Sequence, residues 1–425
     1  MVGEWRKTIY GEISEDFVED RLWNLCDPDV GIQTGPFGSQ LHQEDYVPVG
    51  TPIITVEHLG ENRILHNGMP RVSDPDRDRL SRYMLRTGDI VFSRVGSVDR
   101  RALVRSAEDG WMFSGRCLRV RPDPKRIDSG YLSYFFGLPA FKEHIRAIAV
   151  GATMPSLNTA LLSNVVIPHP NDIAEQRAIA CILDTLDDKI ELNRQMDMTL
   201  EAMARALFKS WVADSNSLRV KVSDLIRDGI LEIGDGYRAK NSEIRKPGLP
   251  FIRAGDLNNG FDTGGADVLC DESVAKSGTK ICRPGDIAFT SKGTIGRFAR
   301  VTDHTAVFVY SPQVCFWRSL NWKRLNPNVL YCWMQTADMK SQIEAVSGQT
   351  DMAPYVSLKD QRHMTIPFFP ESQETIGKHI ELLFARQALF TKENKILACL
   401  RDTLLPKLIS GELRVKDAER IVGII

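Results

Sequence analysis

The chain carries the same sequence pattern twice, about 200 residues apart, and this duplication restricts its possible folds more than any single motif does. The segment GDIVFSRVGS at 88–97 returns as GDIAFTSKGT at 285–294, and GTPII at 50–54 returns as GLPFI at 248–252. Solenoid proteins repeat units of only about 20–50 residues. The longer period instead predicts a duplicated globular domain, and a bivalent reader of something with two matching sites.

Length and composition are those of a soluble protein with several domains. With 425 residues, 43% of them hydrophobic and 26% charged, the chain can form two or three cores. We find no run of about 18 apolar residues for a membrane span and no secretory signal. The eight cysteines form no CxxC pair, so we expect neither disulfides nor zinc, and a cytoplasmic location. The net charge of −1 means that a DNA-binding surface would have to be local.

A long helical segment follows each copy. Residues 175–211 contain neither Pro nor Gly, and a helix of this length spans roughly 54 Å. Their apolar residues follow coiled-coil spacing with one phase break after the fourth: Ile179, Leu183, Leu186, Ile190, Met196, Leu200, Met203, Leu207 and Trp211. The second seam alternates four and three strictly: Ile376, Ile380, Leu383, Gln387, Phe390, Asn394 and Leu397. We expect the seams to pack on each other, with polar Gln387 and Asn394 fixing the register.

Outside these helices, short β-like runs bounded by Gly, Pro or Asp alternate with short helical patterns. The sequence therefore predicts a mixed α/β (α+β) chain in which two globular domains are each followed by a long helix: 1–170, 171–213, 214–370 and 371–425. Helix-start signals occur at 170–172 and 370–372, and the turn-forming DSNS at 214–217 is the expected linker.

Short motifs occur in a characteristic order: GPFGS at 35–39, the two Gly-Asp-Ile segments, IP at 167–168, EQRAIA at 175–180, LFKSW at 207–211 and LLPKLISGEL at 404–413. In this order the chain resembles, over nearly its whole length, the specificity subunits of type I restriction-modification systems. The second copy departs from the pattern, because SQETIG at 372–377 and GDGY at 234–237 stand where the first has EQRAIA and GPFG. Residues are therefore not transferable one by one between copies.

The resemblance implies two target recognition domains, each reading one half of a split DNA sequence, with two antiparallel helices between them. It also implies two methyltransferase subunits as partners, and restriction (translocase) subunits in the full complex. S-adenosylmethionine, ATP and Mg²⁺ would then belong to those partners, and this chain would be non-catalytic, without cofactor or metal. The sequence agrees, since it holds no NPPY, DPPY, GxxxxGK[ST] or HExxH segment.

A basic stretch in the first domain is the main signal for DNA. Residues 92–126 contain nine basic and four acidic side chains, and arginine pairs with guanine or grips phosphate. Candidate contacts lie there and in the earlier glycine-rich turn: Ser39, Gln40, Arg94, Ser97, Arg100, Arg101 and Arg116. The corresponding loops of the second domain supply Arg238, Lys240, Lys292, Thr294 and Arg297. The alternative is that these side chains merely face solvent on strands and turns. Because the two sets differ, we expect an asymmetric target.

The helices and the C-terminal tail carry the partner hypothesis. Trp211, Leu405 and Leu408 are candidate contacts for a methyltransferase subunit, and the alternative is that they cap the helix pair. Two rival functions stay open on the sequence. One is a specificity module of a related phage-defence methylation system, and the other is an interaction scaffold that binds no DNA.

Overall fold

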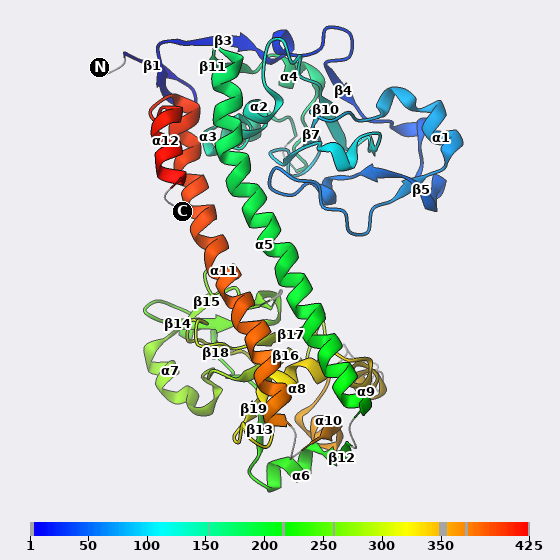
Figure 1. Cartoon of the computed structure of the whole chain (residues 1–425), viewed down its shortest axis with the longest axis vertical. Helices are drawn as coiled ribbons and strands as arrows, with labels where there is room; N and C mark the ends of the chain where they lie inside the picture. Colours follow the sequence, from blue (N-terminus) through cyan, green and yellow to red (C-terminus); the bar gives the residue numbers. More distant parts are fainter. Residues whose placement is uncertain are drawn as a thin grey trace. The chain divides into compact units, whose positions relative to one another are not determined.

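The structure is a computed structural model that describes residues 4–151, 153–214, 217–257, 260–347, 355–369 and 373–423. The chain divides into two compact units: unit 1 comprises residues 1–191 and 394–425, and unit 2 comprises residues 192–393. Each unit holds one α/β module and a segment of both long helices, α5 (Ile173–Asp214) and α11 (Gln373–Ser410) (Figure 1). Residues 215–216 of the expected linker, and the second helix-start signal at 370–372, lie outside the described residues.

Unit 1 builds its module from short strands and helices. The strands are β1 (Trp5–Thr8), β2 (Gly11–Ser14), β3 (Phe17–Arg21), β4 (Ile32–Thr34), β5 (Tyr46–Ile54), β6 (Arg71–Val72), β7 (Ile90–Ser93), β8 (Arg101–Leu103), β9 (Met112–Phe113), β10 (Cys117–Val120) and β11 (Val166–Pro170). The helices are α1 (Asp74–Arg79), α2 (Ser129–Phe135), α3 (Pro139–Ile148), α4 (Thr159–Ser163) and α12 (Val415–Val422). The central sheet is antiparallel and has the order β4-β10-β7-β8, with smaller sheets β6-β5-β9, β11-β3 and β1-β2.

Unit 2 repeats this topology. Its strands are β12 (Leu218–Lys221), β13 (Leu231–Gly234), β14 (Gly248–Ile252), β15 (Asp267–Cys270), β16 (Asp286–Thr290), β17 (Phe298–Arg300), β18 (Val309–Tyr310), β19 (Val314–Ser319) and β20 (Thr365–Phe368). The helices are α6 (Val222–Arg227), α7 (Asp271–Ser277), α8 (Pro327–Met334), α9 (Ala337–Ser347) and α10 (Leu358–His363). The central sheet β13-β19-β16-β17 corresponds strand for strand to that of unit 1. The predicted mixed α/β class and its duplication are confirmed.

A buried ion pair explains the Gly-Asp-Ile segment that occurs in both copies. Both carboxylate oxygens of Asp89 accept hydrogen bonds from Arg121, each at 2.7 Å. In unit 2 Asp286 binds Arg318 in the same way, at 2.7 and 2.8 Å. All four side chains are buried. Because a bidentate pair fixes geometry as well as contributing energy, the motif ties the start of one central strand to the end of its neighbour.

One buried glutamine joins each long helix to its module. The Oε1 atom of Gln176 accepts a hydrogen bond from the backbone N–H of Asp128 at 2.8 Å. Gln373 accepts the equivalent bond from Asn326 at 2.9 Å. Asp128 and Asn326 are the N-caps of α2 and α8, so the same device ties a long helix to a module helix in both units. The divergent SQETIG segment therefore keeps the residue that docks the helix.

The seam of α5 differs from its predicted course. One register of buried side chains runs along the helix: Ile179, Leu183, Leu186, Ile190, Asn193, Ala204 and Phe208. Gln176, Ala180, Ile182 and Asp187 are buried beside it in unit 1. Met196 and Met203, expected on the seam, are 40% and 52% exposed, so this part of the prediction was wrong. The reason is that polar Asn193 and half-buried Asp197 occupy seam positions, which a search for apolar residues passes over. No phase break is needed.

Interhelical contacts in both units show that α5 and α11 run antiparallel. As residue numbers rise along α5, those of the partners on α11 fall: Asp187 contacts Arg401 at 2.7 Å in unit 1, and Asn193 contacts Glu393 at 2.9 Å and Asp197 contacts Gln387 in unit 2. Glu175, near the start of α5, pairs at 3.4 Å with Arg414, just beyond the end of α11. On α11, Ile380 and Phe390 are buried as predicted, whereas Phe384 takes the buried position expected for Leu383. In unit 2 the helix pair therefore contains polar pairs alongside these buried apolar side chains.

We expect Asp286→Asn to destabilise unit 2 strongly, because it removes the bidentate partner of the buried Arg318 guanidinium and leaves only Glu232, at 3.4 Å, as a counter-charge. Removing one partner of a buried pair costs about 3–5 kcal/mol. Asp224→Asn is the matched control, because Asp224 forms an exposed pair with Arg227 in the same unit, and such pairs contribute less than about 1 kcal/mol. Urea unfolding of the full chain measures both variants. Equal losses would show that the buried pair adds nothing beyond an exposed one.

Asp197 should make the helix pair of unit 2 sensitive to pH. Burial raises the pKa of this carboxyl, the hydrogen bond from Gln387 opposes the rise, and the charge of Glu201 adds to it. Because the folded-state pKa lies above the ordinary Asp value of about 3.9, folding favours the protonated form. Stability therefore falls as the pH rises through this window and stays lower above it.

Asp197→Asn is accordingly expected to raise the urea midpoint at pH 7 and to remove this part of the pH dependence. Glu201→Gln should act in the same direction but more weakly, because it relieves only the like-charge contribution. A lower midpoint for Asp197→Asn at pH 7 would contradict the assignment.

Candidate nucleic-acid interface

In unit 1 the loops with candidate residues leave one edge of the central sheet. Cys117, the first residue of β10, pairs with Ser93, the last residue of β7, and β4 ends beside them. The loops 35–40 and 94–100 and the side chain of Arg116 therefore start from the same edge. This edge brings together side chains that lie up to about 80 residues apart in the sequence.

Backbone contacts hold these loops in place. The N–H of Arg94 donates to the carbonyl of Arg116 at 2.8 Å. The glycine-rich turn passes so close to its neighbour that a Cβ on Gly35 would lie 2.2 Å from the Ser114 carbonyl oxygen. Only glycine allows this approach, which accounts for the first residue of the GPFGS motif.

Three cation or hydroxyl candidates of unit 1 lie at this edge. Arg116 and Ser97 are exposed. Arg94 is half-buried, and its Nη1 atom donates to the carbonyl of Gly115 at 3.1 Å. The guanidinium carbon of Arg94 lies 6.0 Å from the ring centroid of Phe37. The Arg94 side chain is thus positioned by its neighbours, whereas Arg116 extends into solvent.

Two further candidates are partly engaged inside the unit. Arg100 is half-buried and donates a hydrogen bond to the carbonyl of Leu59. Gln40 is also half-buried, and its Oε1 atom accepts a hydrogen bond from the hydroxyl of Tyr83 at 2.7 Å. The side chain of Ser39 lies outside the described residues.

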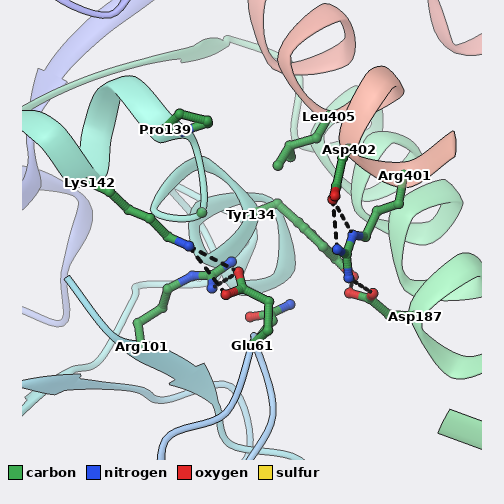
Figure 2. A pocket seen from close by; sticks show the side chains of 11 residues that line it. Glu61, Arg101, Tyr134, Pro139, Lys142, Asp187, Arg401, Asp402 and Leu405 are labelled. Carbon is green, nitrogen blue, oxygen red and sulfur yellow. Dashed lines mark hydrogen bonds and ion pairs between the residues drawn. The ribbon is translucent and has the colours of Figure 1, made fainter. Parts of the chain in front are cut away.

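Arg101 has an internal structural role, contrary to the expectation that it contacts DNA. It is only 2% exposed. Its Nε atom donates to the carbonyl of Ser133 at 3.0 Å and its Nη1 atom to Glu61 at 2.7 Å, and Lys142 pairs with the same carboxylate at 3.2 Å (Figure 2). Burial alone would raise the pKa of Glu61, but the charges of Arg101 and Lys142 hold it below its ordinary value. Arg101 therefore links β8 to α2 and is not offered to a ligand at the edge.

A polar pocket of about 330 Å³ opens beside this cluster within unit 1 (Figure 2). Its lining contains three acidic and three basic side chains: Glu61, Asp187, Asp402, Arg101, Lys142 and Arg401. Their formal charges cancel, so the pocket has no net attraction for phosphate. It lies within the contact between module and helices and is separate from the loop edge.

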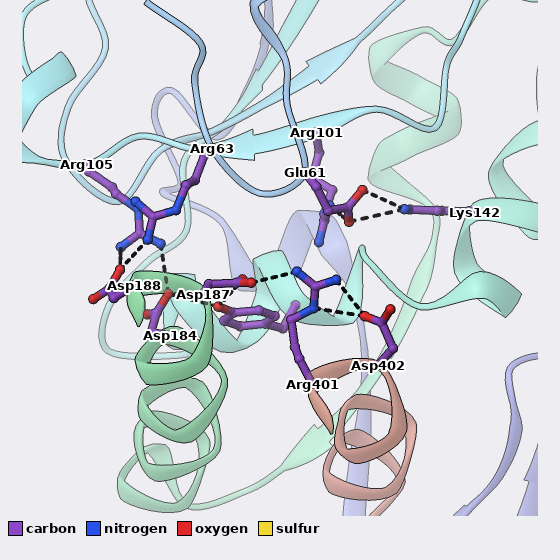
Figure 3. Close-up of polar contacts among 11 residues, drawn as sticks. Glu61, Arg63, Arg101, Arg105, Lys142, Asp184, Asp187, Asp188, Arg401 and Asp402 are labelled. Carbon is purple, nitrogen blue, oxygen red and sulfur yellow. Dashed lines mark hydrogen bonds and ion pairs between the residues drawn. The ribbon is translucent and has the colours of Figure 1, made fainter. Parts of the chain in front are cut away.

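An ionic network that includes Arg105, Asp184, Asp187 and Arg401 seats the module of unit 1 on its helices (Figure 3). The hydroxyl of Tyr134 lies at the centre of this network. It lies 2.8 Å from an oxygen of Asp187 and 3.0 Å from one of Asp184. Arg105 donates to Asp184 at 2.9 Å, and Arg401 donates to Asp187 at 2.7 Å. Burial, reinforced by the two carboxylates, raises the pKa of Tyr134 far above its ordinary value, so the hydroxyl stays protonated.

Unit 2 brings its loops 235–240 and 291–297 to the corresponding edge, through the pairing of β16 with β19 and of β13 with β19. A Cβ on Gly236 would lie 2.1 Å from the Ser311 carbonyl oxygen. This close approach matches that of Gly35 in unit 1. Gly236, the third residue of GDGY, therefore takes the place of Gly35, the first residue of GPFG, so the predicted pairing of the two segments is two residues out of register.

The candidates of unit 2 all lie on these loops. Three of them are exposed: Arg238, Lys240 and Thr294. Lys292 is half-buried, and its Nζ atom lies 4.4 Å from the ring centroid of Tyr355. Arg297 is half-buried and donates to the carbonyls of Ala254 and Leu257, each at 3.5 Å. As in unit 1, one cation rests on an aromatic ring while others extend into solvent.

The two ring-bound cations do not occupy equivalent positions. The backbone N–H of Arg94 donates to the carbonyl of Arg116 at 2.8 Å, and that of Ser291 donates to the carbonyl of Gln313 at 2.9 Å. Ser291 is therefore the counterpart of Arg94. Lys292, one residue later, is the counterpart of Val95. Consecutive residues of an extended chain face opposite sides. The cation therefore lies on one side of the loop in unit 1 and on the other side in unit 2.

The partner candidates are more buried than expected. Leu408 is completely buried and Leu405 nearly so, and both belong to the core of unit 1. Trp211 is half-buried, with its ring centroid 4.0 Å from that of Phe369. Leu405 and Leu408 therefore do not offer a surface to a partner, and their positions fit the alternative that they cap the helix pair.

Other apolar side chains of the helices are exposed in unit 2. Met196 and Met203 lie seven residues apart on α5, and Leu382 and Leu389 lie seven residues apart on α11. Sequence reasoning missed the methionines because it assigned them to the internal seam. The heptad spacing of the two leucines was the signal available in the sequence.

Within the part of the chain that the structure describes, no three His, Cys, Asp or Glu side chains gather in a group that could hold a metal ion. The helices of this part also include none with the length and apolar character needed to cross a membrane.

Comparison with known families assigns the chain. The family model "Type I restriction modification DNA specificity domain" matches residues 38–202 and 227–397, which together make up most of the sequence. The chain belongs to the type I restriction-modification specificity subunits. The resemblance that the motifs carried is thereby confirmed.

Relatives of this specificity subunit cover either nearly all of the chain or about half of it. It is 29% identical to the type I restriction enzyme MjaIX specificity subunit of Methanocaldococcus jannaschii over 444 residues, covering 97% of each chain. It is also 29% identical to the HindI specificity subunit of Haemophilus influenzae over 187 residues, which cover 43% of this chain and 38% of that one. The crystal structure of a type I S subunit from M. genitalium, 18% identical, aligns with a TM-score of 0.53 over 92% of this chain and 96% of that one. This likeness supports the fold.

Proposed function

We propose that this specificity subunit reads an asymmetric, bipartite DNA target, with one half-site bound at the loop edge of each unit. The observation that carries the proposal is the duplicated edge itself. The same strands deliver cationic and hydroxyl side chains to it in both units, while the side chains differ between units. A duplicated frame with divergent loops is what two unlike half-sites require.

The chemistry of the edge suits a nucleic-acid duplex. Exposed cations such as Arg116, Arg238 and Lys240 are suited to phosphates, whose contacts supply affinity without sequence information. Arg94 and Lys292 are held by neighbouring rings and backbone, so they can address base edges from fixed positions. The net charge of −1 means that attraction to DNA has to come from such local groups.

The chain itself would catalyse nothing and bind no cofactor. The names of its curated relatives, specificity subunits of type I restriction enzymes, support this division of labour. Methyl transfer from S-adenosylmethionine would be carried out by two methyltransferase subunits. Restriction and translocation with ATP and Mg²⁺ would belong to further subunits. This chain would position those subunits on the DNA in the cytoplasm.

The exposed apolar pairs of unit 2 form the proposed seat of one methyltransferase subunit. The spacing of Met196 and Met203, and of Leu382 and Leu389, places each pair on one face of its helix. Large apolar side chains repeated every seven residues match a partner helix that packs knobs into holes. We therefore propose an amphipathic helix of the methyltransferase as the occupant.

Arg94→Ala and Lys292→Ala should separate the two half-sites. In the complex with methyltransferase subunits, we expect each variant to relax recognition of one half-site only. A lost base contact costs about 1–3 kcal/mol, or roughly five- to 150-fold in discrimination. The measurement is competition binding, at fixed salt, against duplexes altered in one half-site or the other. The target is first identified by modified-base sequencing of the source genome.

Arg116→Ala is the matched control, because a phosphate contact should weaken binding equally for all sequences and lower the salt dependence. A uniform loss for Arg94→Ala and Lys292→Ala would assign them to phosphates as well. Sequence-independent or absent DNA binding by the unaltered complex would favour the scaffold alternative.

The double variant Met196→Glu/Met203→Glu should weaken methyltransferase binding at least about tenfold, because it places two charges in an apolar contact. Met198→Glu is the control: Met198 is also exposed, but it lies about 200° around the helix from Met196. Affinity is measured with purified subunits, and circular dichroism checks that the helices persist. Equal weakening by both variants would move the contact elsewhere.

A further inference from the structure

Each unit presents one exposed aromatic ring at its loop edge. Phe37 in unit 1 is 60% exposed, and Tyr355 in unit 2 is 41% exposed. Each ring lies against a half-buried cation, Arg94 in unit 1 and Lys292 in unit 2. Single exposed apolar residues are common on protein surfaces. The informative feature is that, in both units, such a ring lies beside a half-buried cation at the loop edge.

Backbone hydrogen bonds hold the segment next to each ring. In unit 1 the turn before Phe37 is held by the Gly35 N–H, which donates to the carbonyl of Cys117 at 3.2 Å. In unit 2 Tyr355 forms a β-bridge with Lys292, and the N–H of the next residue, Val356, donates to Ser291 at 3.0 Å. A ring held in this way loses little conformational freedom when a ligand covers it.

The ring and its cation together match the chemistry of a base pair and its phosphate. An aromatic face offers apolar contact to the methyl group of thymine or to a base plane. The neighbouring cation can address a guanine edge or a phosphate. The cation–π contact also restrains both side chains before binding. The ring can contact a base, and the cation a guanine edge or a phosphate, while both stay at the surface of their unit.

Two other exposed aromatic side chains, Trp23 and Trp322, do not share this setting. Trp23 and Trp322 are each 51% exposed. Cys26, shortly after Trp23, bridges to Pro122 beyond the end of β10, and Trp322 follows the end of β19. Both tryptophans therefore lie toward the opposite edge of their central sheets. Exposure alone does not bring an aromatic ring to the loop edge.

We propose that Phe37 and Tyr355 are specificity-determining residues, each contacting one base pair of the half-site that its unit reads. This inference rests on the proposed function and extends it beyond the charged side chains. Arg94 and Lys292 lie on opposite sides of equivalent loops. Phe37 and Tyr355, which contact these cations, therefore also lie on opposite sides. The base pair read by the ring is therefore placed differently in the two half-sites.

The test compares ring variants in the intact complex with its methyltransferase subunits. Phe37→Ala and Tyr355→Ala remove the rings, whereas Phe37→Tyr and Tyr355→Phe retain them. Trp23→Ala and Trp322→Ala are the controls for loss of an exposed aromatic side chain. Modified-base sequencing of cells that make each variant gives the methylated motif. Competition binding to duplexes with single base-pair changes gives the discrimination, and thermal melting checks the fold.

Each alanine variant should lose discrimination at one base pair of one half-site, by roughly five- to 150-fold, the range of a single base contact. The other half-site should stay unchanged, and the conservative variants and tryptophan controls should keep the full motif. An unchanged motif in folded alanine variants, or an equal loss for every duplex, would overturn the proposal. If the unaltered complex shows no sequence-selective methylation or binding, the proposed function fails, and the ring contact fails with it.

Discussion

The bidentate ion pairs Asp89–Arg121 and Asp286–Arg318 hold the end of each central sheet that lies opposite the loop edge. Each carboxylate is buried and satisfied by its arginine, so removing Arg121 or Arg318 would leave a buried carboxylate without its counter-charge. The strands therefore keep their pairing whatever the loops at the other end contain. The ion pairs and the loops thus lie at opposite ends of the same strands. This explains why Gly-Asp-Ile is the same in both copies while the residues that follow it diverge. It also agrees with the general finding that binding residues lie on loops placed by a rigid scaffold.

In the two units, the α/β module contacts the long helices through different interactions, although the docking glutamines Gln176 and Gln373 are equivalent. In unit 1 the contact is ionic and centred on Tyr134. In unit 2 the guanidinium carbon of Arg300 lies 4.1 Å from the ring centroid of Phe384, and Arg300 donates to Asn328 at 2.5 Å. Burial lowers the pKa of Arg300, which reflects the apolar setting of this cation. The glutamine thus provides the shared anchor, and the surrounding side chains were free to change between charge and apolar packing.

The sequence predicted the features that depend on periodicity and order: the duplication, the α/β modules, the two long helices and a glycine turn after the first strand of each central sheet. It could not predict which way a side chain points when both faces of a strand are covered. Arg101 and Arg116 are both basic residues at a strand start, yet only Arg101 turns into the unit. The error at Met196 and Met203 has a similar cause, because polar Asn193 and Asp197 hold the seam through partners far away in the sequence. Phe37 lay within a predicted loop, but nothing local distinguished its exposed ring from a core residue.

A shift of one residue between the copies shows how a duplicated module can acquire a second specificity. Lys292 matches Val95, and Arg94 matches buried Ser291, so the central cation has changed sides of the loop. The shift leaves the strand pairing and the close approach of Gly35 and Gly236 intact, because these depend on the backbone alone. The ring beside the cation also comes from a different segment in each unit: Phe37 lies on the glycine turn of unit 1, and Tyr355 lies on the segment of unit 2 that bridges to Lys292. Divergence of the reading surface thus requires few substitutions and no change of fold, provided that the ion pair and the glycine turn are kept.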